Sequence, residues 1–220
     1  MRIEKYIHAC LLVEDGGTRI LFDPGKFSFM EGGTKPEHFR GLAAIVVTHE
    51  HADHMDDQSL KTIVANNPGA PVFGNSSIRE RLAEKGIDVE VHESGTRTIG
   101  AIQLRAIVAT HANLLNATPP RNVGYVVNDR LLHPGDSFDE SLDACRGIEI
   151  LALPVMAPWC TELQVAAFAV SLAPKVAIPI HDGYAKDFFR KSRYENYGKY
   201  FAQHGIEFIG LDAVGAALER

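Results

Sequence analysis

Three histidines and two acidic residues lie within six consecutive positions of the chain, in the segment His49-Glu50-His51-Ala52-Asp53-His54. The apolar run 43–47 before this segment is typical of a buried strand, and residues 56–66 after it have the apolar spacing of a helix. On the loop between them, His49 and His51 can turn toward one point, and Asp53 and His54 toward a second, adjacent point. Imidazole nitrogens and carboxylate oxygens bind zinc and related transition metals. The segment therefore predicts a metal site and not merely a polar loop rich in histidine.

Four further residues with metal-binding side chains stand at or near the ends of predicted apolar strands: Asp23, His111, Asp136 and His181. A single histidine at such a position is usually a capped or solvated residue. Strand ends on one rim of stacked sheets converge in space, however, and α/β proteins place their sites there. We therefore expect these four side chains to meet the histidine-rich loop at one rim of the fold.

The order and spacing of these residues resemble the five-part signature of the metallo-β-lactamase superfamily. The matching parts, which extend over residues 3–181, are Asp23, His49-x-His51-x-Asp53-His54, His111, Gly135-Asp136 and His181. Segments 6–13, 22–25 and 178–183 are also similar to the compact branch of metal-dependent hydrolases that includes ascorbate-6-phosphate lactonase. The resemblance implies an α/β (α+β) fold, a four-layer αββα sandwich of two mixed sheets packed face to face with helices outside.

The resemblance also implies a role for each matching residue. A first metal ion would be held by His49, His51 and His111, a second by Asp53, His54 and His181, and Asp136 would bridge the two. Asp23 would orient one of these ligands through a hydrogen bond. The two divalent ions, Zn²⁺ first with Mn²⁺ or Fe²⁺ as alternatives, would ionise a bridging water, and the hydroxide would attack carbon or phosphorus. Asp53 is the candidate catalytic residue, because it could orient the hydroxide or pass a proton to the leaving group.

Other residues near the predicted site loops are weaker candidates for contact with substrate. They are His8, Asn113, His133, Trp159 and Tyr184, together with Lys186. Packing or surface exposure is the alternative for each of them. The long loop 26–42 carries Phe27, Phe29 and Met30, which could form a lid over a substrate or a plug beneath the loop. Three further histidines are expected at the surface: His38, His92 and His204.

Hydrophobic patterning predicts the elements that position these residues. Strands are expected over 2–13, 18–22, 71–74, 88–92, 102–109, 123–128, 130–133, 148–153, 175–180 and 206–211, in addition to 43–47. Helices are expected over 56–66, 161–172 and 187–204, with one more that begins at Ser76 or Ser77, uses Glu80 in a capping box, and ends at Gly86. A short tail follows residue 211. The pattern favours helices that flank two packed sheets.

Composition limits the class of protein. At 220 residues the chain is long enough for one large domain. We expect a single metallo-β-lactamase-like hydrolase domain over residues 1–220, with two halves, roughly 1–120 and 121–220, that share one core. Its three scattered cysteines do not form a disulfide framework, and neither a secretory signal nor a membrane-spanning run is visible. We therefore expect a cytoplasmic protein with no membrane partner, and a homo-oligomer stays open.

The function that these observations predict is metal-dependent hydrolysis of an ester-like bond, a lactone, phosphoester or thioester, in a small or medium substrate. A phosphodiesterase or nuclease is an alternative, but the net charge of −6 disfavours a nucleic-acid partner. An iron-dependent redox enzyme is another alternative, because the ligand types do not exclude iron. Diiron relatives, however, carry glutamate where His51 stands. A non-catalytic scaffold is disfavoured because no ligand position is lost.

Overall fold

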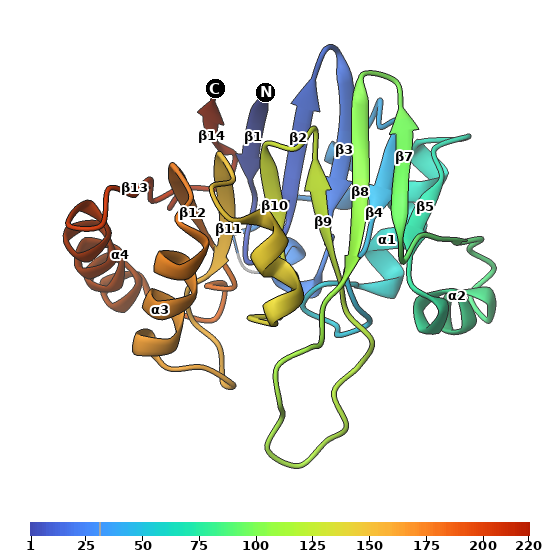
Figure 1. Ribbon diagram of the computed structural model, residues 1–220. Coiled ribbons are helices and arrows are strands. Elements are labelled where there is room, and N and C mark those ends of the chain that lie inside the picture. Colours follow the sequence, from blue (N-terminus) through green and yellow to red (C-terminus); the bar gives the residue numbers. More distant parts are fainter. Residues whose placement is uncertain (31) are drawn as a thin grey trace.

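The computed structural model describes residues 1–30 and 32–220 of the chain. Over this described part, two seven-stranded sheets lie face to face and helices cover their outer faces (Figure 1). The first sheet has the order β14 (Ala216–Glu219), β1 (Arg2–Lys5), β2 (Leu11–Asp15), β3 (Thr18–Phe22), β4 (Ala44–Val46), β5 (Val72–Gly74) and β6 (Glu90–Val91). The second has the order β13 (Glu207–Phe208), β12 (Val176–Ile180), β11 (Ile150–Pro154), β10 (Leu131–His133), β9 (Val123–Val127), β8 (Ile102–Val108) and β7 (Gly95–Ile99).

The two sheets share one pattern of strand pairing. From β14 to β3, and from β7 to β10, neighbouring strands are antiparallel. From β3 to β6, and from β10 to β13, neighbouring strands are parallel. Parallel neighbours end at the same edge of a sheet, so each sheet presents a row of carboxyl ends to the lower rim in Figure 1.

Three layers of buried apolar side chains hold the sheets and helices together. The central layer lies between the sheets and draws on both, with Phe22 from the first and Tyr125 from the second. Helices α1 (Asp57–Asn66) and α2 (Ser76–Ala83) pack against the first sheet, and α3 (Glu162–Leu172) and α4 (Asp187–Ala202) against the second. The order helix, sheet, sheet, helix confirms the predicted four-layer αββα sandwich.

Side-chain caps fix where the helices next to the site begin. Asp56 Oδ2 accepts a hydrogen bond from the Ser59 backbone N–H at 3.0 Å, which starts α1 directly after the histidine-rich loop. Thr161 and Gln164 form a reciprocal capping box at the start of α3. Both helices therefore begin close to the rim where the strand ends meet.

The prediction that Ser76 or Ser77 caps α2 together with Glu80 is wrong. Asn75 caps this helix, because its Oδ1 accepts the N–H of the third helical residue at 3.0 Å. The backbone N–H and hydroxyl of Ser76 instead donate to the Glu93 carboxylate, at 2.8 and 3.0 Å.

Two strands have no counterpart among the predicted elements. β7 is an exposed, polar edge strand that pairs with β8, so it lacks the apolar alternation that marks a half-buried strand. β14 lies in the expected tail and pairs antiparallel with β1 at the other end of the chain. The expectation that His92 lies at the surface is also wrong, because its ring is buried and its Nε2 lies 3.0 Å from the Leu104 carbonyl oxygen.

The long loop after β3 contains two short 3₁₀ helices, η1 (Lys26–Phe29) and η2 (Pro36–His38), and a third, η3 (Glu140–Cys145), follows β10. Residue 31 of the predicted loop 26–42 lies outside the described residues. Phe29 packs against the first sheet's helix-facing layer, whereas Met30 is exposed. No helix in the described ranges is both long and apolar enough to cross a membrane.

Candidate metal centre

Five strands from both sheets deliver the predicted site residues to one rim. Asp23 directly follows β3, and the segment 49–54 follows β4 in the first sheet. His111, Asp136 and His181 follow β8, β10 and β12 in the second sheet. The two rows of strand ends face each other here, so side chains far apart in the sequence come within a few ångströms.

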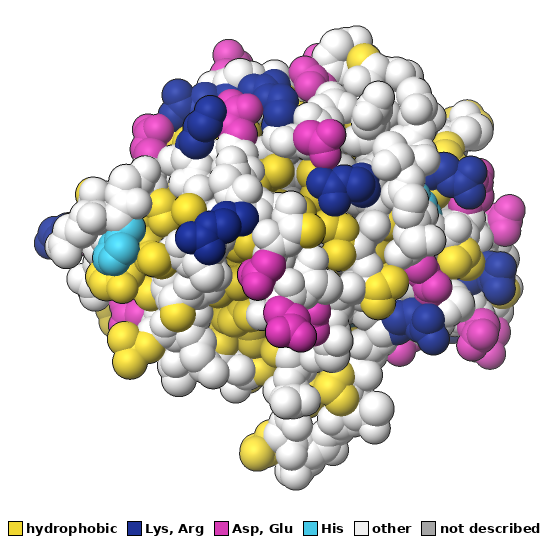
Figure 2. Space-filling model, viewed as in Figure 1, with side chains coloured by type: hydrophobic (Ala, Val, Ile, Leu, Met, Phe, Trp, Pro, Cys, Tyr) yellow, Lys and Arg dark blue, Asp and Glu magenta, His cyan; other side chains and the backbone are white. Residues whose placement is uncertain are grey.

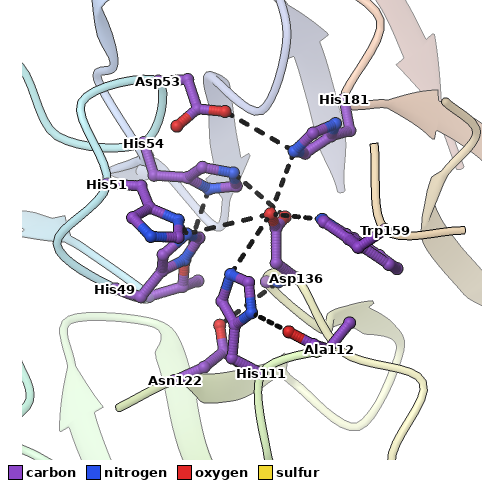
Figure 3. Close-up of polar contacts among 12 residues, drawn as sticks. His49, His51, Asp53, His54, His111, Ala112, Asn122, Asp136, Trp159 and His181 are labelled. Atoms are coloured by element: carbon purple, nitrogen blue, oxygen red, sulfur yellow. Dashed lines mark hydrogen bonds and ion pairs between the residues drawn. The ribbon is translucent and has the colours of Figure 1, made fainter. Parts of the chain in front are cut away.

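Asp136 lies at the middle of this cluster, and histidine rings surround it (Figure 3). Its Oδ1 lies 3.1 Å from His54 Nε2, and its Oδ2 lies 3.0 Å from His181 Nε2 and 3.6 Å from His111 Nε2. The carboxylate is buried, as are all three of these rings. A single carboxylate therefore touches ring nitrogens from both sheets.

The potential ligand atoms form two neighbouring groups, and within each group they all lie within 4.8 Å of one another. The first group contains His49, His51, His111 and Asp136, and the second contains His8, Asp53, His54 and His181. The structure thus brings together all seven residues that the sequence predicted as ligands. It adds His8 to the second group, and it places Asp136 against members of both.

The buried ring nitrogens have the protonation pattern of metal ligands. His111 Nδ1 lies 2.6 Å from the Ala112 carbonyl oxygen, and His181 Nδ1 lies 2.6 Å from that of Met156. A carbonyl only accepts, so each Nδ1 carries a proton and each Nε2 faces the centre, where it can bind a metal ion once its ring is neutral. Second contacts of this kind are typical of histidines that bind metal.

Several atoms at the centre are left without hydrogen bonds. Among the residues that the structure describes, His111 Nε2 is buried without a hydrogen-bond partner, and His54 Nε2 and Asp136 Oδ1 lie 3.1 Å apart without the geometry of a hydrogen bond. Orphaned buried polar atoms are rare and costly, and a bound ion is one cause of them. His49 Nε2 and His51 Nδ1 lie 3.1 Å apart, and two nitrogens on a tetrahedral zinc ion are separated by about 3.3 Å. The residues present therefore fit a metal pair.

Burial and charge act on these groups in opposite directions. Burial lowers the pKa of His49 well below its ordinary value, which keeps the imidazole neutral. Burial also lowers the pKa of His54, but the carboxylates of Asp136 and Asp23 outweigh it and raise that pKa well above the ordinary value. Burial raises the pKa of Asp136, yet the neighbouring charges of His181 and His54 hold it well below the usual range. Asp136 is thus an anion surrounded by groups that carry or attract positive charge.

Asp23 holds the loop that carries the histidines. Its Oδ2 lies 2.7 Å from His54 Nδ1 and accepts the Thr48 hydroxyl proton at 2.8 Å. Its Oδ1 accepts the Thr48 backbone N–H at 2.8 Å. These bonds fix the ring of His54 and the start of the loop, which is the position the sequence predicted for an orienting residue.

His8 is buried behind Asp53, and it does not line the pocket above the cluster. The Gly183 backbone N–H donates to His8 Nδ1 at 3.0 Å, so the ring proton is on Nε2, which donates to Asp53 Oδ2 at 3.0 Å. Burial, aided by the charge of His181, lowers the pKa of His8 to about 4. His8 therefore acts as a neutral donor that orients Asp53.

The backbone at the site is strained at three residues. His8, Asp23 and His181 have φ values of 67°, 42° and 63°, in the left-handed region that residues other than glycine rarely adopt. Such strain gathers at functional sites, where surrounding contacts enforce it. Gly25 makes room for the loop, because a Cβ at this position would lie 1.7 Å from the Asp53 carbonyl oxygen. A side chain there cannot coexist with the observed course of the loop.

A pocket of about 470 Å³ opens above the cluster. Trp159 and Tyr184, which the sequence offered as substrate contacts, line it, and Trp159 Nε1 donates to Asp136 Oδ2 at 3.1 Å. Lys26 and Leu114 also line it, although the sequence did not single them out. Their signal was their place in loops that follow predicted strand ends. Phe27 of the expected lid lies in the same wall.

Two other candidate contacts lie elsewhere. His133 is buried between the sheets, where its ring stacks on Phe22 at 5.3 Å and its Nε2 lies 3.2 Å from the Ala9 carbonyl oxygen. Asn113 is exposed and does not line this pocket, although its neighbour Leu114 does.

An αββα sandwich that gathers two groups of histidine and aspartate ligands at one rim defines a metal-dependent hydrolase of the metallo-β-lactamase type. A family model described as a beta-lactamase superfamily domain matches residues 2–181. The chain belongs to this superfamily.

Curated relatives and solved structures agree with this assignment. The chain is 35% identical to Protein Rv0786c of Mycobacterium tuberculosis over 188 residues, which covers 82% of this chain and 84% of that protein. It is 30% identical to the UPF0173 metal-dependent hydrolase Ta0764 of Thermoplasma acidophilum over 190 residues, which covers 82% and 83% of the two chains. The fold is similar to that of Igni18, a metallo hydrolase from Ignicoccus hospitalis, with a TM-score of 0.75, 19% identity, and coverage of 100% and 98%.

Proposed function

We propose that this protein hydrolyses an ester-like bond, a lactone, phosphoester or thioester, in a small or medium substrate with the help of two divalent metal ions. The observation that carries the proposal is the pair of ligand groups that meet at Asp136, where His111 Nε2 is buried and unpartnered among the described residues and His54 Nε2 and Asp136 Oδ1 lie 3.1 Å apart without a hydrogen bond. The first ion would be held by His49, His51 and His111, and the second by Asp53, His54 and His181, with Asp136 between them. Zinc suits this mixture of imidazole and carboxylate best, and manganese and iron are the alternatives.

When bound, the metal pair supplies Lewis acidity and lowers the pKa of a coordinated water from 15.7 to about 7. The chain's own residues do the rest. Asp53 lines the pocket and is one-quarter exposed, so it can reach a bound substrate or water. The hydrogen bond from His8 and the charge of His54 outweigh the effect of burial and hold the pKa of Asp53 well below its usual range. As an anion, Asp53 can accept a proton from the nucleophile and then deliver it to the leaving group.

The pocket favours a small molecule over a nucleic acid. Its volume of about 470 Å³ lies within the range for small-molecule sites. On the face shown in Figure 2, Lys and Arg side chains are interspersed with Asp and Glu. The net charge of −6 likewise opposes a polyanionic partner.

Metal content and turnover test the proposal together. Protein prepared without chelator is assayed for metal by elemental analysis and for activity on lactone, phosphodiester and thioester substrates. His111→Gln is expected to lose bound metal and at least a hundredfold in turnover, whereas His204→Gln, at an exposed histidine of the C-terminal half, keeps both. Wild-type protein that binds less than one equivalent of metal, or His111→Gln protein that turns over normally, contradicts the proposal.

A further inference from the structure

A second, larger pocket adjoins the one above the metal cluster. Its volume is about 700 Å³, and it lies between the loop after β11, the loop after β12 and the first turns of α3 and α4. Pro158 and Tyr184 belong to the walls of both pockets. These two residues therefore separate adjoining pockets, and a molecule bound over the metal cluster would reach the second pocket by lying across the exposed ring of Tyr184.

Residues where the two pockets adjoin form hydrogen bonds with the metal cluster. His181 Nδ1 lies 2.6 Å from the carbonyl oxygen of Met156, whose residue forms part of the second pocket's wall. The Tyr184 hydroxyl donates to the same carbonyl and lies 3.2 Å from His181 Nδ1. Met156 in the wall of the second pocket is thus in direct contact with His181, a predicted metal ligand.

Hydrocarbon dominates the lining of the second pocket. Its apolar walls include Val155, Met156, Ala185, Phe188, Phe189 and Tyr197. Phe188 is 74% exposed and Phe189 is 44% exposed. Contiguous exposed apolar surface of this kind marks binding sites for ligands or other proteins. On the face shown in Figure 2, hydrophobic side chains gather over the side of the molecule where α3 and α4 lie.

The charged groups at this pocket largely offset each other. Arg193 forms an ion pair with Glu162, and its guanidinium lies 5.0 Å from the centre of the Phe189 ring. The opposite charges of Arg193 and Glu162 offset each other, so this pair offers little net charge to an ionic group of a ligand. Lys186 lies in the same wall and is exposed, so it can remain in water while its stem covers apolar surface.

We propose that the second pocket binds the hydrocarbon chain of the substrate, so that the enzyme acts on esters, thioesters or lactones that carry a medium or long acyl chain. This inference rests on the proposed function, because it places the scissile carbonyl over the metal cluster and the chain beyond Tyr184. The shared wall and the apolar lining favour this occupant over a second copy of the chain or a membrane surface. Neither of those would account for an apolar pocket that shares a wall with the pocket over the metal cluster.

Chain-length dependence of hydrolysis tests the inference. With p-nitrophenyl esters from acetate to decanoate, kcat/KM is expected to rise about fourfold for each methylene that becomes buried, until the pocket is full. The double variant Phe188→Ser, Phe189→Ser should lose at least tenfold on the decanoate ester and change little on the acetate ester. Leu163→Ser is the matched control, because Leu163 is 81% exposed on α3 and does not line the pocket.

A binding measurement separates failure of the inference from failure of the proposed function. Calorimetry follows the binding of decanoate to metal-depleted protein, where catalysis plays no part; wild-type and Leu163→Ser protein should bind, and the double variant should bind at least tenfold more weakly. Hydrolysis of the acetate ester without any dependence on chain length overturns the inference and leaves the function standing. If wild-type protein binds decanoate, the double variant does not, and no ester is hydrolysed, then the pocket binds a hydrocarbon chain but ester hydrolysis as the function is refuted. If the double variant changes only the oligomeric state or binding to phosphatidylcholine vesicles, the face serves another partner and the inference fails.

Discussion

Replacement of His8 by asparagine tests how the second group of ligands is held in place. His8 makes two hydrogen bonds from a fully buried position: Nδ1 accepts the Gly183 N–H, and Nε2 donates to Asp53 Oδ2, both at 3.0 Å. The asparagine Oδ1 can take the place of Nδ1, but its side chain is too short to reach Asp53. Asparagine also tolerates the left-handed φ of 67° at this position. The variant therefore removes the contact with Asp53 and disturbs little else.

The expected magnitude follows from the kind of bond that is lost. A hydrogen bond to a charged group contributes about 1.5–3 kcal/mol. Since about 1.4 kcal/mol corresponds to a factor of ten in an equilibrium constant, affinity for one metal equivalent should fall by about 10–100-fold. The other equivalent, on the side of His49 and His51, should be held as in wild type.

Competition with a chromophoric chelator measures the two affinities separately. His8→Gln is the complementary variant, because its Nε2 can still donate to Asp53 while the Gly183 contact is lost; it should retain more of the second metal than His8→Asn. If His8→Asn keeps both equivalents at wild-type affinity, the orienting role of His8 is refuted. A large loss of folding stability, read from urea unfolding of the metal-free protein, would instead assign His8 to packing.

Three further changes have outcomes that the structure dictates. Gly25→Ala should destabilise the protein by at least about 3 kcal/mol in urea unfolding and lower its metal content, because the new Cβ would overlap the Asp53 carbonyl; near-native stability would contradict this. Lys5→Met should lower the free energy of unfolding by about 3–5 kcal/mol, because it leaves the buried Asp182 carboxylate, now 2.5 Å from the Lys5 ammonium, without its cationic partner and with only the Tyr194 hydroxyl as a side-chain donor; Asp182→Asn should recover part of the loss in the double variant. Metal titration of chelator-treated protein should change the fluorescence of Trp159, the only tryptophan, because its indole contacts Asp136. The free energy of unfolding should rise by about 2.7 kcal/mol at a hundredfold excess of metal over Kd. A flat fluorescence trace would contradict the contact between the indole and the cluster.

Local patterns in the sequence predicted the main strands and helices of this protein and its ligand-type residues. The apolar strand before His49, the helix that starts after Asp56, and the ligand-type residues at strand ends are all readable over short windows, because side-chain periodicity and ligand chemistry are local properties. They predicted helices that flank two packed sheets and one rim on which ligand-type residues converge, whereas the αββα order and the seven ligands were implied by the resemblance to the metallo-β-lactamase superfamily. The structure brings those residues together, with Asp136 in contact with histidines from both sheets.

Tertiary structure alone decided the contacts that tune the site. The bonds from Gly183 to His8 and from Trp159 to Asp136 join residues far apart in the sequence, and no local pattern announces them. The exposed strand β7 and the terminal strand β14 were missed for a similar reason, since each depends on a partner strand more than on its own hydrophobic pattern. The apolar pocket beyond Tyr184 likewise arises only when the loops after β11 and β12 pack beside α3 and α4. The sequence by itself therefore indicates which residues can act as metal ligands. The orientation of their rings, the shape of the pockets and the pairing of distant strands depend on which segments the fold places side by side.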